Sequence, residues 1–179
     1  MFYDTIKSKQ KEKAGEKMAL ETHTFQPVFD AYSKVLILGT FPSVKSRENC
    51  FYYGHPQNRF WKVIAHLTGE PVPETIEQKK SLLLQNKIAI WDVIQSCDIV
   101  GSSDSSIKNV TASDLSLVLT KSSISKIFAN GATAAKLYNK YQKESTGMEI
   151  ITLPSTSPAN AAYSLERLCQ IWQSIKDTL

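Results

Sequence analysis

Side chains that could bind a nucleotide are concentrated between residues 41 and 61. Flat aromatic faces come from Phe41, Phe51, Tyr52, Tyr53, Phe60 and Trp61. Charge and hydrogen bonds come from Lys45, Arg47, His55, Asn58 and Arg59. Aromatic faces stack on bases, and cations contact phosphates. The mixture therefore indicates a site for a base and its phosphates.

An unbroken apolar run, Val35 to Leu38, comes directly before this segment and is closed by Gly39. Such a run is typical of a parallel strand that is covered on both faces, rather than of an alternating surface strand. Ligands of open α/β sheets bind at the carboxyl ends of such strands. We therefore expect the aromatic segment to lie at one edge of a sheet.

Strands and helices alternate along the rest of the chain. Three further buried strands are expected at 88–91, 126–129 and 149–153. Helices are expected at about 58–67, 74–85, 115–119, 131–141 and 161–176. This order favours an α/β fold of three layers, α/β/α, around a central, mostly parallel four-stranded sheet. The strand ends would then bring together Phe41, Asp92, Asn130 and Ser155.

Composition and spacing exclude several classes of protein. The chain has 179 residues, 42% of them hydrophobic, and no apolar run approaches the ~20 residues that cross a bilayer. The N-terminus has no apolar signal-peptide segment, so we expect a cytoplasmic protein. The cysteines lack CxxC spacing, and the three histidines lack metal-ligand spacing, which places His23, His55 and His66 at the surface or in loops. No metal and no cofactor are expected.

Charge is modestly basic, with a net charge of +4. This balance favours a polyanionic partner but is shared by many proteins that never bind DNA. Lysines are frequent near the N-terminus, so residues 1–20 are predicted to be a flexible basic extension. Residues 21–179 are predicted to form a single domain, and the protein is expected to be a monomer.

Several motifs resemble those of the uracil-DNA glycosylase superfamily. HPQNRFWKV, residues 55–63, looks like the HPxNRFWKV of mismatch-specific uracil-DNA glycosylases, and GTFPS, residues 39–43, takes the place of their GINPG. The chain is still more similar to the hypoxanthine-DNA (deoxyinosine) glycosylase branch, through YYGHPQNRFW, WDV, SSDSSI, ANG and LPSTSPAN. The resemblance covers about residues 25–179. It implies a monofunctional DNA glycosylase that flips out a deaminated base, most of all hypoxanthine, and leaves an abasic site in double-stranded DNA.

The resemblance also assigns catalytic positions, with one departure. The third position of GINPG is an Asn or Asp that places the attacking water, but here it is Phe41, which cannot orient or deprotonate water. The branch pattern makes Asn58 the first candidate for that role, and the alternative for Asn58 is to cap the helix that follows. Asn130 is the second catalytic candidate, with an Asn-Gly turn as its alternative.

Four residues are predicted to bind the base. Thr40 and Phe41 belong to GTFPS, and Tyr53 takes the place of an aromatic residue that stacks on the flipped base; core packing is the alternative for Tyr53. Asp92 could accept the N1–H of hypoxanthine, where adenine has an acceptor. An ionised Asp92 would repel O6, however, so its alternative role is to cap a turn or orient the SSDSSI loop.

DNA backbone contacts are predicted for Lys45 and for the hydroxyl loop Ser155, Thr156 and Ser157. A solvated cation and an ordinary Pro/Ser turn are the respective alternatives. Two other functions remain open at this point. One is a uracil- or mismatch-specific DNA glycosylase. The other is a noncatalytic damaged-DNA-binding module, which Phe41 and Leu153 favour because each stands where the family has a polar group.

Overall fold

A computed structural model of the chain describes residues 17–179. Most of the predicted basic extension, residues 1–16, lies outside the described residues. Strand β1 (Ala19–Thr22) begins before residue 21, so the last two residues assigned to that extension belong instead to a paired strand.

The central sheet has four parallel strands in the order β3-β2-β6-β7. These are β2 (Val35–Gly39), β3 (Ile88–Asp92), β6 (Lys126–Asn130) and β7 (Ile150–Leu153). Every residue of β2 and β3 is buried, as expected for strands that are covered on both faces. The predicted α/β class, the four strands and their parallel arrangement are confirmed.

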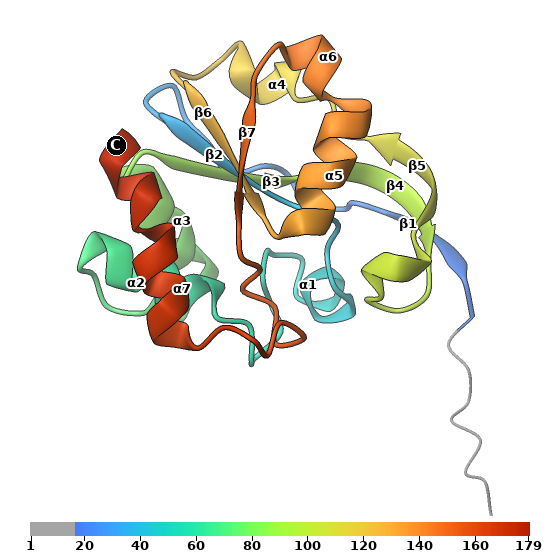
Figure 1. The fold of residues 1–179 in the computed structure, drawn as a ribbon, viewed down its shortest axis with the longest axis horizontal. Helices are drawn as coiled ribbons and strands as arrows, with labels where there is room; N and C mark the ends of the chain where they lie inside the picture. The colour runs from blue at the N-terminus through green and yellow to red at the C-terminus, as the bar shows by residue number, and fades with distance from the viewer. Residues whose placement is uncertain (1–16) are drawn as a thin grey trace, which may run out of the picture.

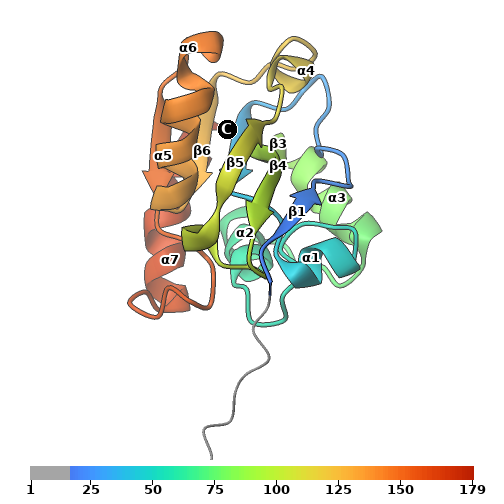
Figure 2. The same ribbon diagram turned by 90° about the vertical axis from the view of Figure 1, so that its right-hand side faces the viewer.

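Helices cover both faces of this sheet. They are α2 (Phe60–Thr68), α3 (Ile76–Gln85), α5 (Ala132–Tyr141) and α7 (Leu165–Trp172). Helix α5 packs on β6 and β7, α3 packs on β3, and α2 packs against α7. Figure 2 shows α5 and α3 on opposite sides of the strands. The last helix is shorter than expected because Ser164 caps it, accepting from the N–H of Arg167, and a 3-10 segment, η2 (Gln173–Thr178), follows it.

A second sheet, which the sequence pattern did not predict, lies beside the first. It is antiparallel and has the order β1-β4-β5, with β4 (Ile94–Ile99) and β5 (Lys108–Ala112). Strand β4 starts only one residue after β3 ends, so the chain passes directly from one sheet to the other. Pairing of β1 with β4 draws the N-terminal part of the chain against the end of β3 (Figure 2).

Four shorter helical segments complete the described residues. They are α1 (Val44–Glu48), η1 (Asp104–Ser106), α4 (Ser116–Leu119) and α6 (Lys143–Thr146). Helix α1 was not predicted, and its N-cap Ser43 belongs to GTFPS. In Figure 1, α1 and the loops that follow β2 and β7 gather at the same end of the central sheet. The carboxyl ends of the parallel strands therefore share one edge, as predicted.

Membrane-spanning helices are absent from residues 17–179, where no helix combines sufficient length with sufficient apolar character.

The cysteines differ in exposure, which leads to a prediction about thiol reactivity. Cys50 is exposed, whereas Cys97 and Cys169 are buried. Burial raises the pKa of Cys97 to about 11 and also raises the pKa of Cys169, so neither forms the reactive thiolate at neutral pH. A disulfide reagent such as DTNB is expected to modify only Cys50 rapidly in the native protein. The Cys50→Ser variant should lose this fast phase. A second fast-reacting thiol in the native protein would contradict the burial of Cys97 and Cys169.

Candidate active site

A cavity of about 670 Å³ opens at the carboxyl edge of the central sheet. Its volume falls within the range typical of small-molecule sites. Seven of the residues predicted from sequence line it: Thr40, Phe41, Tyr53, Asp92, Asn130, Ser155 and Ser157. The strand ends thus bring together residues that lie more than a hundred positions apart in the chain.

Gly39 lies at the centre of the inner wall, because β2 and β3 pair in a register that sets it opposite Asp92. A Cβ built on Gly39 would lie 2.2 Å from Asp92 Oδ1 and 3.3 Å from Tyr53 Oη. The first distance is far inside van der Waals contact. Only glycine therefore lets the Asp92 carboxylate and the Tyr53 hydroxyl approach the strand at the same time.

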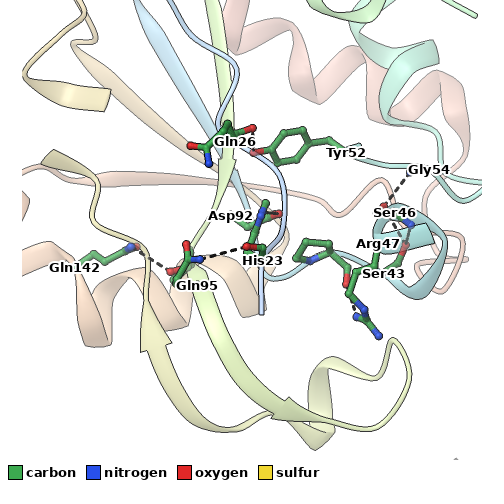
Figure 3. Close-up of polar contacts among 12 residues, drawn as sticks. His23, Gln26, Ser43, Ser46, Arg47, Tyr52, Gly54, Asp92, Gln95 and Gln142 are labelled. Atoms are coloured by element: carbon green, nitrogen blue, oxygen red, sulfur yellow. Dashed lines mark hydrogen bonds and ion pairs between the residues drawn. The ribbon is translucent and has the colours of Figure 1, made fainter. Parts of the chain in front are cut away.

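Asp92 is 4% exposed and is hydrogen-bonded to His23, which is 5% exposed. The Nε2 of His23 lies 2.9 Å from Asp92 Oδ2, and Figure 3 shows the imidazole directly beside the carboxylate. His23 lies in a loop, as expected, but it is buried rather than at the surface. No spacing in the sequence indicated this contact, because it depends on the pairing of β1 with the unpredicted β4.

Tyr53 is both part of the core and part of the cavity wall. Its ring stacks on Phe60 with centroids 3.8 Å apart, so the packing alternative holds for one face of the ring. Its backbone φ of 53° is in the left-handed region, which is uncommon for a bulky residue and is often found at functional sites. The Oη is buried without a hydrogen-bond partner among the described residues. Burial raises the pKa of the Tyr53 phenol, and the charge of Asp92 raises it further; the neighbouring Asn130 side chain opposes the shift without cancelling it, so the hydroxyl stays protonated.

Phe41 supplies an apolar wall and no group that could hold water. Its ring meets the His23 ring edge-on at 6.3 Å, and the guanidinium of Arg47 lies 5.7 Å from its centroid. Arg47 itself donates to the carbonyls of Pro42 and Gly101, so its guanidinium links two loops beside the cavity. GTFPS therefore lacks, at Phe41, the polar side chain that the resembling family has at this position.

Asn130 and Asn58 are joined through Thr156. The Nδ2 of Asn130 donates to Thr156 Oγ1 at 2.9 Å, and the backbone N–H of Thr156 donates to Asn130 Oδ1 at 2.9 Å. The Thr156 hydroxyl then donates to Asn58 Oδ1, which also accepts from the N–H of Phe60, the first residue of α2. Asn130 lines the cavity, but Asn58 does not. The helix-start alternative for Asn58 is thus present in the structure.

The hydroxyl loop differs from the prediction at one residue. Ser155 and Ser157 line the cavity, whereas Thr156 has an exposed fraction of 0%. Its hydroxyl and N–H both bond to asparagine side chains, so Thr156 supports the loop from inside the protein. Lys45 is exposed on α1, outside the cavity lining, and pairs with Glu48 at 2.6 Å, as the solvated-cation alternative expects.

Arg59 holds this loop in place with its guanidinium group. Its Nε donates to the carbonyl of Thr156 at 3.2 Å, and its Nη2 donates to the carbonyls of Ser157 and Asn160 at 2.7 and 3.0 Å. Its Nη1 donates to the carbonyl of Tyr163. The side chain that sequence reasoning treated as a source of positive charge is therefore an internal brace.

Asp104 is a cavity residue that was not predicted, although it lies in the SSDSSI motif. It belongs to η1, between β4 and β5, and lies near Thr40 and Asp92. Asp104 is exposed to solvent as a residue, but partial desolvation of its carboxyl raises the pKa; a hydrogen bond from Thr40 opposes the shift, and the charge of Asp92 adds to it. The motif itself was the available signal, but its small polar residues indicated only a loop.

Groups of three or more His, Cys, Asp or Glu side chains that could hold a metal ion do not occur in the part of the chain from 17 to 179.

Comparisons with known proteins agree with this geometry. The family model described as "Uracil DNA glycosylase superfamily" matches residues 26–177. A hypoxanthine DNA glycosylase from Methanosarcina acetivorans is 34% identical over 157 residues, which is 84% of this chain and 95% of that protein. One from Methanosarcina barkeri is 35% identical over 95 residues, 52% of this chain and 60% of that protein.

A solved structure is similar as well. It is the solution NMR structure of a Methanosarcina acetivorans protein described as a candidate uracil DNA glycosylase. The two structures superpose with a TM-score of 0.71 at 31% sequence identity, over 85% of this chain and 96% of the other.

Proposed function

The chain belongs to the uracil DNA glycosylase superfamily and is a DNA glycosylase, and we propose that the base it releases is hypoxanthine. The relatives that carry that name support the choice of base. The reaction is hydrolysis of the N-glycosyl bond of a flipped-out nucleotide, which leaves an abasic site. We propose a monofunctional enzyme that acts as a monomer on double-stranded DNA in the cytoplasm.

The main support for the proposal is that the Asp92 carboxylate and the protonated Tyr53 hydroxyl both lie at the inner wall of the cavity. Asp92 Oδ2 is engaged by His23, which leaves Oδ1, on the Gly39 side, to accept the N1–H of hypoxanthine. Tyr53 supplies the O–H that O6 needs, and this donor answers the repulsion expected between O6 and a lone carboxylate. Adenine reverses both groups of this edge, since its N1 accepts and its N6 donates. Its exclusion follows from the same two side chains.

Bond cleavage needs charge stabilisation on the base and a water on the sugar. Asn130 lines the cavity, and Thr156 uses one of its two amide N–H groups, while the side chain also neighbours the Tyr53 hydroxyl. We propose that the second N–H donates to the departing base. Asn58 is proposed to act through Thr156, by holding that amide in place. The cavity's second carboxylate, Asp104, is proposed to orient and deprotonate the water, because its pKa lies above the ordinary value and Phe41 can do neither.

Duplexes that contain inosine, uracil or only normal bases test this proposal. Strand cleavage by alkali after incubation reports abasic sites, and release from inosine is the expected result. The Asp104→Asn variant should lose about 100-fold or more of the single-turnover rate, the usual contribution of a general base, while it still binds the inosine duplex. Release of uracil with no action on inosine would favour the mismatch-specific alternative. An Asp104→Asn variant as fast as the wild type would remove Asp104 from the mechanism.

A further inference from the structure

His23 has no role in the chemistry described so far, and it lies outside the 26–177 span that the family model matches. We propose that His23 is a positioning residue, which holds the Asp92 carboxylate so that Oδ1 faces the base. This inference rests on the proposed role of Asp92 in base recognition. His23 acts through Asp92 and does not itself touch the substrate.

Among residues 17–179, the His23 imidazole and the Asp92 carboxylate have each other as their only hydrogen-bond partner. His23 Nε2 lies 2.9 Å from Asp92 Oδ2, and both side chains are shielded from solvent. The other carboxylate oxygen, Oδ1, lies on the Gly39 side, at the cavity wall. A charge-assisted hydrogen bond to one oxygen of a carboxylate restricts the rotation of the group. The orientation of Oδ1 therefore depends on the donor that engages Oδ2.

Aromatic rings and backbone bonds keep the imidazole in one orientation. The rings of Phe25 and Tyr52 lie 4.4 and 5.8 Å from it, and Tyr52 is anchored by donation to the carbonyl of Gln26 (Figure 3). The backbone N–H of His23 donates to the carbonyl of Gln95 at 2.7 Å, and the Gln95 side chain donates back to the His23 carbonyl. The strand pairing of β1 thus delivers the imidazole to the carboxylate as a fixed group.

Burial also decides the tautomer of His23. Its Nδ1 is buried and has no hydrogen-bond partner among residues 17–179. A proton on Nδ1 would be an unpaired buried donor, which is more costly than an unpaired acceptor. The tautomer with its proton on Nε2 avoids this cost and donates to Asp92. Asp92 is then held as an acceptor, which is what the N1–H of a deaminated purine requires.

Two substitutions separate the hydrogen bond from the packing. His23→Gln keeps an N–H near the position of Nε2 but removes the ring, whereas His23→Phe keeps a ring and removes the donor. If the donor matters, His23→Phe should lower the single-turnover rate of hypoxanthine release roughly 10- to 100-fold, the range for a lost hydrogen bond to a charged group. His23→Gln should stay within a few fold of the wild-type rate. A purely structural histidine predicts the reverse order.

A double-mutant cycle shows whether the effect passes through Asp92. In an Asp92→Asn background, His23→Phe should cause little further loss, because its partner is already altered. Equal losses from His23→Phe in both backgrounds, or a His23→Phe variant as fast as the wild type, would overturn the inference. Melting temperatures of all variants show how much protein is folded under the assay conditions.

The inference and the proposed function can fail separately. Wild-type activity on inosine tests the function. If the wild type releases only uracil, the same variants are compared on uracil, whose N3–H offers Asp92 a donor of the same kind. If no base is released, ¹⁵N NMR of the labelled histidines decides alone: we expect a buried His23 that is protonated at Nε2, and a proton on Nδ1 instead would overturn the positioning role.

Discussion

Replacement of Gly39 by alanine is expected to reduce base release by about 100-fold or more, the loss that follows a displacement of about 1 Å in a catalytic group. The added Cβ would lie 2.2 Å from Asp92 Oδ1, so the carboxylate must move. The backbone cannot yield instead, because β2 is buried along its whole length and pairs with β3 and β6. This movement would distort the hydrogen bond between Asp92 and His23. Single-turnover assays on an inosine duplex measure the effect.

A matched glycine serves as the control for stability. Gly39→Ala should also lower the free energy of unfolding by about 1–3 kcal/mol through overpacking. Gly69→Ala carries a comparable cost of about 1–2 kcal/mol, because Gly69 has a φ of 73°, yet a Cβ there meets no atom within 4 Å. The Gly69 variant should therefore be destabilised but fully active. Equal activity of the two variants would show that Gly39 has no special place in the site.

Replacement of Arg59 by lysine is expected to lower the free energy of unfolding by about 2–3 kcal/mol and to reduce activity at least tenfold. A lysine keeps the charge but cannot donate at once to the carbonyls of Thr156, Ser157, Asn160 and Tyr163. The loop would loosen, and Thr156 would release the amide of Asn130. Urea unfolding gives the stability, and inosine assays below the unfolding transition give the activity.

Arg167, in α7 shortly after the same loop, provides the corresponding control. It is exposed, and its guanidinium lies 5.5 Å from the ring of Tyr163 without the backbone bonds that Arg59 makes. Arg167→Lys should change the stability by less than about 0.5 kcal/mol, as is usual for a surface substitution. If Arg59→Lys and Arg167→Lys unfold at the same urea concentration, the brace does not contribute to stability as we expect.

Local sequence patterns were sufficient for the architecture of the central sheet. The run Val35–Leu38 was typical of a strand buried on both faces and is one, and Ile88 and Lys126 begin strands that were predicted to start at those residues. The parallel order follows because each strand is separated from the next by a helix. The same logic placed Asp92, Asn130 and Ser155 at one edge, and all three line the cavity.

The second sheet and the residues that depend on it were not predictable in this way. Strand β4 contains both buried and partly exposed residues, and only Val93 separates it from β3, so no turn signal divided the two strands. Asp104 lies on the β4–β5 connection, and His23 follows β1. Asp104 reaches the cavity, and His23 reaches Asp92, only because antiparallel pairing brings these distant segments together.

By itself, the sequence determined the fold class, the family motifs and the set of strand ends that form the site, because apolar periodicity and strand termination are properties of neighbouring residues. Only the tertiary structure decided which polar atoms remain for a ligand. The hydrogen bond that engages Asp92 comes from a residue 69 positions away, and the one that engages the Asn130 amide comes from a residue 26 positions away. Such bonds depend on distances in space, which no local pattern of residue types records.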